Sequence, residues 1–246
     1  TLPSSSRPLP ASRLQASRRP VHFHSRASSR RRKRRSLWGT NARKEEIIDA
    51  CAALYETMGF RDITIRDIGA RTSFTRTSIY NYFQTKEEIF LALLQREHEA
   101  WIADLEEMVR QETALTPEGF ADRMACTLER RACMLKLESM NLYDMEGSSR
   151  MENLVAFKRT YGRAMKAVAR CLETFFPAMT EQEVREFLYA FFPFLFGVYP
   201  YAVPTEKQRR AMALAGVEAA RCSIRQLVRV FVLKMLRPFQ QPPAEA

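Results

Sequence analysis

Side chains that can bind a nucleic-acid backbone and read base edges are concentrated in one short segment of the chain. The candidates there are Thr75, Arg76, Thr77, Ser78, Tyr80, Asn81, Tyr82 and Lys86. Hydroxyl and cationic groups bind phosphate oxygens, arginine can form two hydrogen bonds with guanine, and asparagine can do the same with adenine. Ile79 and Phe83 fall among them at helical spacing and are expected in a core. The segment therefore predicts a short helix with one buried face and one face suited to DNA.

Three short helices with a tight turn are expected to position these groups. Apolar residues recur on one helical face from residue 42 until Gly59 ends the pattern. A second short helix is expected to begin at Thr64, and a third at Thr75 that runs through Tyr82, because a threonine hydroxyl caps free N–H groups. This arrangement predicts a helix-turn-helix unit.

The helix starts themselves can contribute to binding. A helix N-terminus favours phosphate through its free N–H groups and its dipole, so Thr64 joins Thr75 as a candidate ligand. Arg66 on the second helix is a further candidate. A structural role stays open for each, since the threonines can be caps alone and Arg76 can be a solvated charge.

Longer helices are expected over the rest of the chain. Their starts are predicted by capping patterns at Thr85 with Glu88, at Thr116 before Pro117, at Thr180 with Glu183 and at Thr205 with Gln208. One helix is expected to extend to about residue 145 and another to cover about residues 151–176. The last two patterns should each open a long apolar helix. The predicted fold class is all-α.

The positive charge of the chain lies at its N-terminal end. The net charge is +11, and residues 1–36 hold eleven of the 39 basic residues but no acid, so the rest balances the 28 acidic residues. Residues 1–40 are rich in Pro, Ser and Arg and predict a disordered basic tail, and residues 237–246 predict a second disordered tail. The basic arm could add non-specific phosphate contacts or serve as a nuclear address. An over-extended start of the reading frame is the open alternative.

The sequence offers little for catalysis, metals or membranes. Two of the three histidines lie in the basic tail, and His98 has no metal-ligand spacing around it. A glycine-rich phosphate loop and a Ser–His–Asp arrangement are lacking, so we expect no enzyme, no cofactor and no metal. The five cysteines form no CxxC pair and are expected as small core residues. Residues 187–205 carry no charge, but three prolines interrupt them, so a buried helix is expected rather than a membrane span.

The order of the helices and several short motifs resemble the tetracycline-repressor family of bacterial transcription regulators. The resemblance rests on residues 47–50, on Gly59-Phe60, on Thr64, on the run 75–83 and on residues 86–88. It is specific over residues 43–90 and architectural over residues 91–236. It implies a helix-turn-helix DNA-binding domain at residues 41–88, followed at residues 89–236 by a helical domain that binds a small-molecule effector and forms a homodimer.

The same resemblance implies roles for individual residues. Residues 75–82 would lie in the major groove of a double-stranded DNA operator, while Thr64, Tyr80 and Lys86 would contact phosphates. The implied function is a ligand-responsive regulator, most directly a cytoplasmic repressor that a small effector releases from its operator. This chain departs from the family's pattern at Ser73, where relatives usually have glycine. Serine there costs about 1 kcal/mol if the turn needs a positive φ.

Aromatic residues are unusually dense in the C-terminal half. Phe157, Tyr161, Tyr189 and Phe192 are predicted to line an apolar effector pocket, with plain core packing and a dimer interface as open alternatives. A constitutive or architectural DNA-binding protein without an effector is the alternative function. Deletion of residues 1–36 separates the two, because an architectural protein would lose nearly all its affinity and a helix-turn-helix regulator would keep sequence-specific binding.

Overall fold

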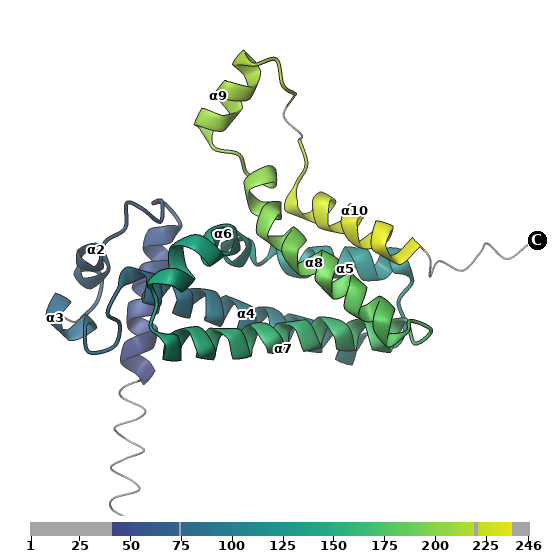
Figure 1. The fold of residues 1–246 in the computed structure, drawn as a ribbon, viewed down its shortest axis with the longest axis horizontal. Coiled ribbons are helices and arrows are strands. Elements are labelled where there is room, and N and C mark those ends of the chain that lie inside the picture. The colour runs from purple at the N-terminus through teal and green to yellow at the C-terminus, as the bar shows by residue number, and fades with distance from the viewer. Residues whose placement is uncertain (1–40, 74, 219–220, 238–246) are drawn as a thin grey trace, which may run out of the picture. The chain divides into compact units, whose positions relative to one another are not determined.

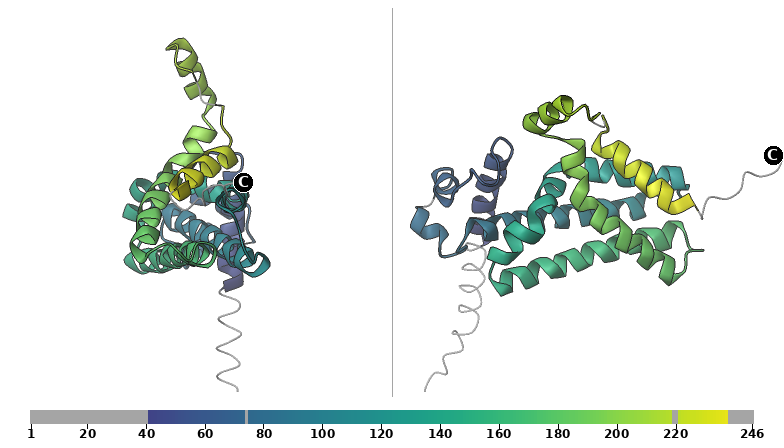
Figure 2. Two further views of the ribbon diagram at one scale, coloured as in Figure 1. Left: turned by 90° about the vertical axis from the view of Figure 1, so that its right-hand side faces the viewer. Right: turned by 45° about the horizontal axis from the view of Figure 1, so that its top comes forward.

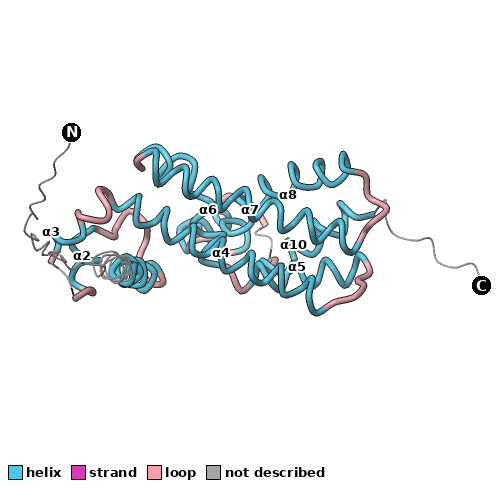
Figure 3. The backbone as a smooth tube through the Cα atoms, turned by 90° about the horizontal axis from the view of Figure 1, so that it is seen from below, coloured by secondary structure: helices cyan, strands magenta, loops and turns pink. Residues whose placement is uncertain are grey.

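The structure of the chain, a computed structural model, describes residues 41–73, 75–218 and 221–237. Every regular element within these ranges is a helix, and Figure 3 shows helices joined by loops, which confirms the predicted all-α class. The contacts divide the chain into a unit of residues 1–43 and a compact unit of residues 44–246. The predicted tails at residues 1–40 and 237–246 lie outside the described residues, except for Arg237.

Three short helices come first. One covers residues 41–55, α2 covers Ile65–Ala70 and α3 covers Arg76–Ile79. The third helix is shorter than predicted, because beyond Ile79 the chain continues in turns that carry Asn81 and Tyr82. The buried residues that hold this part together are Ile47, Cys51, Leu54, Ile63, Ile68, Ile79 and Phe83.

The helices that follow pack in pairs. The two longest, α4 (Lys86–Gln111) and α7 (Met151–Phe175), lie along one another, as Figures 1 and 2 show. α5 (Pro117–Glu129) packs against α10 (Ile224–Leu236), and α8 (Glu181–Ala202) packs against α6 (Ala132–Met140) and α10. The predicted caps at Thr85, Thr116, Thr180 and Thr205 all bind the expected backbone N–H groups.

Two helices that the sequence pattern predicts as continuous are divided. The first breaks after α5, where Arg131 leaves the helical conformation and donates to Asp104 at 2.9 Å. It then continues as α6, the π-helical turn η1 (Asn141–Met145) and the short 3-10 helix η2 (Glu146–Ser148). The long helix expected from Thr205 is only α9 (Glu206–Leu214), which has no buried residue and stands apart in Figure 1.

The break between α9 and α10 has a local cause. Gly216 takes a positive φ of 66°, a left-handed conformation that ends a helix. A new capping box of Ser223 with Gln226 then starts α10. The prediction of one long helix from residue 205 was therefore wrong.

The turn before α3 avoids the strain considered for Ser73. Among the residues that the structure describes, only Gly216 has a positive φ, so Ser73 bears no left-handed penalty. Its N–H instead donates to the Glu46 carboxylate at 2.6 Å.

The charge-free segment at residues 187–205 lies mostly in α8, where Phe187, Phe191 and Phe192 are buried. No single helix of the described ranges is long and apolar enough to cross a membrane; α8 and α9, bent by 78° at their junction, reach that length and composition only together. All five cysteines are free thiols, of which Cys51 and Cys171 are buried and the other three are half-buried.

Candidate functional site

The predicted DNA-contacting residues around α3 lie at the surface. Exposed or half-exposed there are Thr75, Thr77, Ser78, Tyr80 and Asn81. Ile79, between them, is completely buried and anchors the helix. The Thr75 hydroxyl accepts from the Ser78 N–H and lies 3.0 Å from the Ser78 hydroxyl. The prediction for Arg76 concerns a side chain outside the described residues. This exposure suits base and phosphate contacts, which remain predictions.

Thr64 is a helix cap in the structure. Its hydroxyl accepts from the Asp67 N–H at 3.3 Å and donates to the Asp67 carboxylate at 2.6 Å. The same carboxylate accepts from the Thr64 N–H at 2.9 Å, and these bonds from Thr64 lower the pKa of Asp67. The Asp67 carboxylate thus occupies both the N–H and the hydroxyl donor of Thr64. Arg66 beside it is exposed.

The half-buried Lys86 binds backbone carbonyls of its own chain. Its Nζ lies 2.8 Å from the Phe60 carbonyl, 3.3 Å from that of Arg61 and 3.1 Å from that of Ile63. An ammonium has three N–H donors, so the loop before α2 can take all of them. The structure favours a role in holding that loop to α4, and the phosphate contact implied by the family resemblance remains a prediction.

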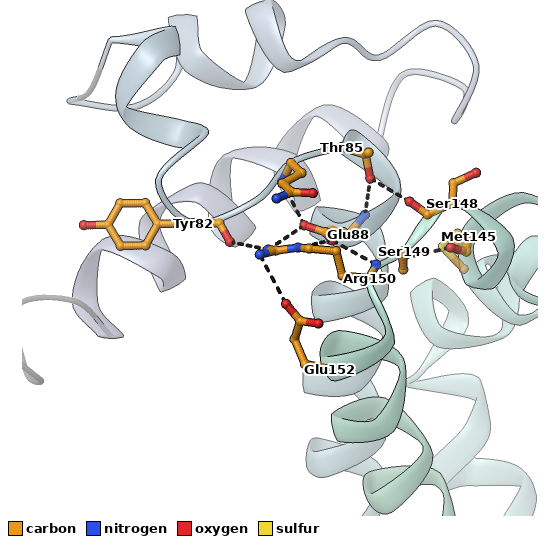
Figure 4. Close-up of polar contacts among 9 residues, drawn as sticks. Tyr82, Thr85, Glu88, Met145, Ser148, Ser149, Arg150 and Glu152 are labelled. Carbon is orange, nitrogen blue, oxygen red and sulfur yellow. Dashed lines mark hydrogen bonds and ion pairs between the residues drawn. The ribbon is translucent and has the colours of Figure 1, made fainter.

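An ion pair with a buried carboxylate, which the sequence pattern did not reveal, ties α4 to α7. Glu88, in the first turn of α4, has a fully buried side chain, and Arg150 is the N-cap of α7. Arg150 donates from Nε at 2.7 Å, from Nη2 at 2.9 Å and from its backbone N–H at 3.0 Å (Figure 4). We call Glu88 and Arg150 the latch.

The latch also reaches the segment that follows α3. Glu88 accepts from the Gln84 N–H at 2.8 Å, and Arg150 Nη2 donates to the Tyr82 carbonyl at 3.3 Å (Figure 4). The Thr85 hydroxyl accepts from the Glu88 N–H and donates to the Ser148 carbonyl at 3.2 Å. The capping box predicted at Thr85 is therefore half formed, because the Glu88 carboxylate is used by the latch.

The environment of Glu88 keeps it ionised. Burial opposes the charge, but hydrogen bonds from Arg150 and from the Gln84 N–H outweigh it and lower the Glu88 pKa to about 2. A buried carboxylate with several donors is costly to disrupt, because removal of either partner leaves an uncompensated charge. The latch therefore connects the segment after α3 to α7.

Three of the four predicted effector residues meet in the core. The Tyr161 ring centroid lies 6.2 Å from that of Phe157 and 5.2 Å from that of Phe192. From α4, the His98 ring lies 5.8 Å from Phe157 and the Trp101 ring lies 6.1 Å from Phe192. We call these five residues the aromatic cluster.

The structure does not bring Tyr189 to this cluster. It is 66% exposed, and among the described residues no ring contact joins it to the other three. Phe187 and Phe191, each two positions away on α8, face the core, so the helical rotation turns Tyr189 outward.

A polar pair is buried within the aromatic cluster. His98 Nε2 lies 2.6 Å from Glu138 Oε1, and both side chains are almost completely buried. Sequence reasoning left His98 without a partner, because Glu138 lies 40 positions away on α6. Burial, together with Glu138 and Glu146, raises the Tyr161 pKa to about 12, so its hydroxyl stays neutral.

Two protein families match the chain, and their matches meet at residue 94, within α4. Residues 47–93 match the family described as bacterial regulatory proteins, tetR family. Residues 95–237 match the family described as tetracyclin repressor-like, C-terminal domain. An uncharacterized HTH-type transcriptional regulator, YdgC from Bacillus subtilis, is 32% identical over 91 residues, which is 37% of this chain and 46% of that relative. The chain thus spans about half the length of this curated relative.

Solved structures share the fold at low sequence identity. A TetR/AcrR-family regulator from Thermobifida fusca is 15% identical with a TM-score of 0.54, covering 81% of this chain and all of that one. PfmR from Thermus thermophilus is 15% identical with a TM-score of 0.52, covering 79% and 99%. FadR from Bacillus subtilis, solved with stearoyl-CoA, is 15% identical with a TM-score of 0.52, covering 78% and 96%.

Proposed function

The chain belongs to the tetracycline-repressor family of bacterial transcription regulators, and from this premise we propose that it is a repressor released from its operator by a small effector. The exposed residues of α3 and of the turns directly after it would read DNA, with Thr77 and Asn81 at base edges and Tyr80 on phosphate. Two protomers would bind one operator. The effector would bind at the aromatic cluster.

One observation carries the proposal. α4 and α7 lie along one another, and each has a latch residue at one end and residues of the aromatic cluster farther along (Figure 1). A ligand that spreads the cluster must displace α4 relative to α7. Because Arg150 also holds the Tyr82 carbonyl, that displacement reaches the segment directly after α3.

The free energy that couples effector binding to operator binding is expected to be modest. A ligand shifts the equilibrium only by its different affinity for the two arrangements, and such couplings are typically about 1–3 kcal/mol. Because the latch bonds both helices and the segment directly after α3, a displacement of the helices would also displace that segment. The fold neighbour FadR was solved with stearoyl-CoA, which makes acyl-CoA compounds one class worth testing here.

The alternative is a constitutive DNA-binding protein without an effector. It is favoured by the packing of Phe157 and Phe192, which are 0% and 2% exposed, as in a solid core. The two functions differ in whether any small molecule changes operator affinity.

The test begins with an operator selected from random DNA and measures its affinity by fluorescence anisotropy against stearoyl-CoA and a panel of cationic and neutral aromatic compounds. We expect a compound that weakens binding, and we expect Phe157→Ala to blunt that response by at least about tenfold at nearly unchanged operator affinity. Tyr143→Ala, at a 93% exposed position on η1 and away from α8 and α10, is the control. A Phe157→Ala protein that responds like the wild type, or a panel without effect, would reject the effector role of the cluster.

A further inference from the structure

Three buried polar atoms beside the aromatic cluster have no hydrogen-bond partner: His98 Nδ1, Glu138 Oε2 and Asn141 Oδ1. The Asn141 amide is oriented by its nitrogen, which donates to Glu146 at 3.0 Å. The 2.6 Å contact between His98 and Glu138 requires a proton between Nε2 and Oε1. Whichever of these two atoms carries that proton, Glu138 Oε2 and Asn141 Oδ1 are acceptors. These two buried oxygens therefore lack hydrogen-bond donors.

The charges and dipoles around these atoms favour a cation. Glu138 is a buried carboxyl group, and Glu138 and Asn141 stand at the C-terminal end of α6, where the helix dipole is negative. Lys158 lies 5.7 Å from the Tyr161 ring centroid, but it is bonded to Glu146 at 2.6 Å. Aromatic faces, such as those of the cluster, attract cations further.

We propose that the effector is an arylalkylammonium ion, whose N–H groups bind Glu138 and Asn141 and whose apolar part lies among the rings of the cluster. Only its role as an effector rests on the proposed function; the binding stands without it. The acceptor atoms are enclosed, so the ligand enters by separating the helices that cover them. His98 lies on α4 and Asn141 opens the π-helical turn η1, a kind of turn found frequently at functional sites.

The ligand class is tested with two probes of the same shape. Phenethylammonium and propylbenzene differ only in an ammonium group in place of a methyl group. In calorimetric titrations of the full chain, we expect phenethylammonium to bind at least about tenfold more tightly, because hydrogen bonds between a buried carboxylate and a cation are strong. Glu138→Gln should remove that difference. Glu129→Gln, at an exposed position at the end of α5, should preserve it.

The outcomes separate this inference from the proposed function. Equal binding of the two probes, undiminished binding of phenethylammonium to Glu138→Gln, or no detectable binding of it would overturn the ligand class. Operator release by stearoyl-CoA without binding of the cation would overturn the ligand class and leave the proposed function standing. Binding of the cation that depends on Glu138, with unchanged operator affinity, would support the ligand class and reject the effector role. The comparison of probes on the wild type needs no variant to fold.

Discussion

The negative charge of Glu88 is expected to stabilise the folded protein. Its pKa is lowered from 4.5 to about 2, since the donors of Arg150 and Gln84 outweigh burial. A carboxyl group with a lowered pKa in the folded state stabilises the protein above its unfolded pKa and loses that contribution as the pH falls through the folded value. The latch should therefore contribute about 3 kcal/mol near neutral pH, and the contribution should disappear from about pH 4.5 down to about pH 2.

Glu88→Gln is expected to lower the free energy of unfolding by about 3 kcal/mol at pH 7 and to flatten its dependence on pH in the acid range. Urea unfolding followed by circular dichroism at a series of pH values measures both effects. Glu152→Gln is the control, because Glu152 also lies near Arg150, at 3.4 Å, but is 68% exposed, so a change within about 0.5 kcal/mol is expected. Equal stability of Glu88→Gln and the wild type would show that the latch is not a stabilising contact.

Lys86 can either hold the loop before α2 or bind a phosphate. The free energy of unfolding and the salt dependence of operator binding distinguish these two roles. Lys86→Met keeps the aliphatic stem and removes the donors to three carbonyls, so we expect a loss of about 1–3 kcal/mol in the free energy of unfolding. The salt slope of operator binding should stay unchanged. Arg66→Met, at an exposed position, should instead lower that slope by about 1. A lower slope with unchanged stability for Lys86→Met would restore Lys86 as a phosphate ligand.

Residue types predicted which side chains around α3 are exposed, but they did not predict the buried contacts of Glu88 and His98. The hydroxyls and the amide around α3 could be selected from sequence, because DNA recognition needs those groups at the surface. The partners of Glu88 and His98 could not be selected, since they lie 62 and 40 positions away in the chain. Such pairs depend on how helices pack, and a single sequence does not specify that packing.

Helix starts were predictable because their signals are local. The hydroxyls at Thr64, Thr75, Thr85, Thr116, Thr180 and Thr205 all cap helices in the structure. The capping box of Ser223 and Gln226 carries the same signal and would have revealed the start of α10. The break at Arg131 has no such mark, because it depends on Asp104 from another helix.

The lengths of the helices were predicted less accurately than their starts. α3 ends at Ile79 although apolar spacing continues to Phe83, and in the turns after it the Tyr82 carbonyl accepts a hydrogen bond from Arg150. η1 interrupts the regular helix where Asn141 turns its amide toward Glu146. The first departure lies beside a hydrogen bond between distant parts of the chain, and the second lies beside a local one that spans five positions.

Across the whole molecule, the proposed operator binding requires a second copy of the chain, because a helix as short as α3 contacts too few base pairs to be selective alone. α8 and α10 pack against each other and expose Tyr189 at 66% and Val230 at 48%. Phe187 is 1% exposed, and the ring centroids of Phe194 and Phe231 lie 4.0 Å apart. Phe187 and Phe194 therefore belong mainly to the protomer's own core. The exposed apolar side chains of α8 and α10 are therefore the better candidates for a dimer interface.

Tyr189→Glu should consequently weaken dimer formation, seen by light scattering as a shift toward monomer, and operator affinity should fall with it. A charge placed in an apolar interface is left without a partner, and a monomer contacts one half-site only. Tyr143→Glu, at a 93% exposed position on η1, is the control and should leave both properties unchanged.

For the wild type, a footprint should show two symmetric half-sites centred about 34–36 Å apart, or a multiple of that distance, because the two reading helices enter grooves on one face of the DNA. A monomer that protects a single asymmetric half-site with full affinity would contradict this arrangement.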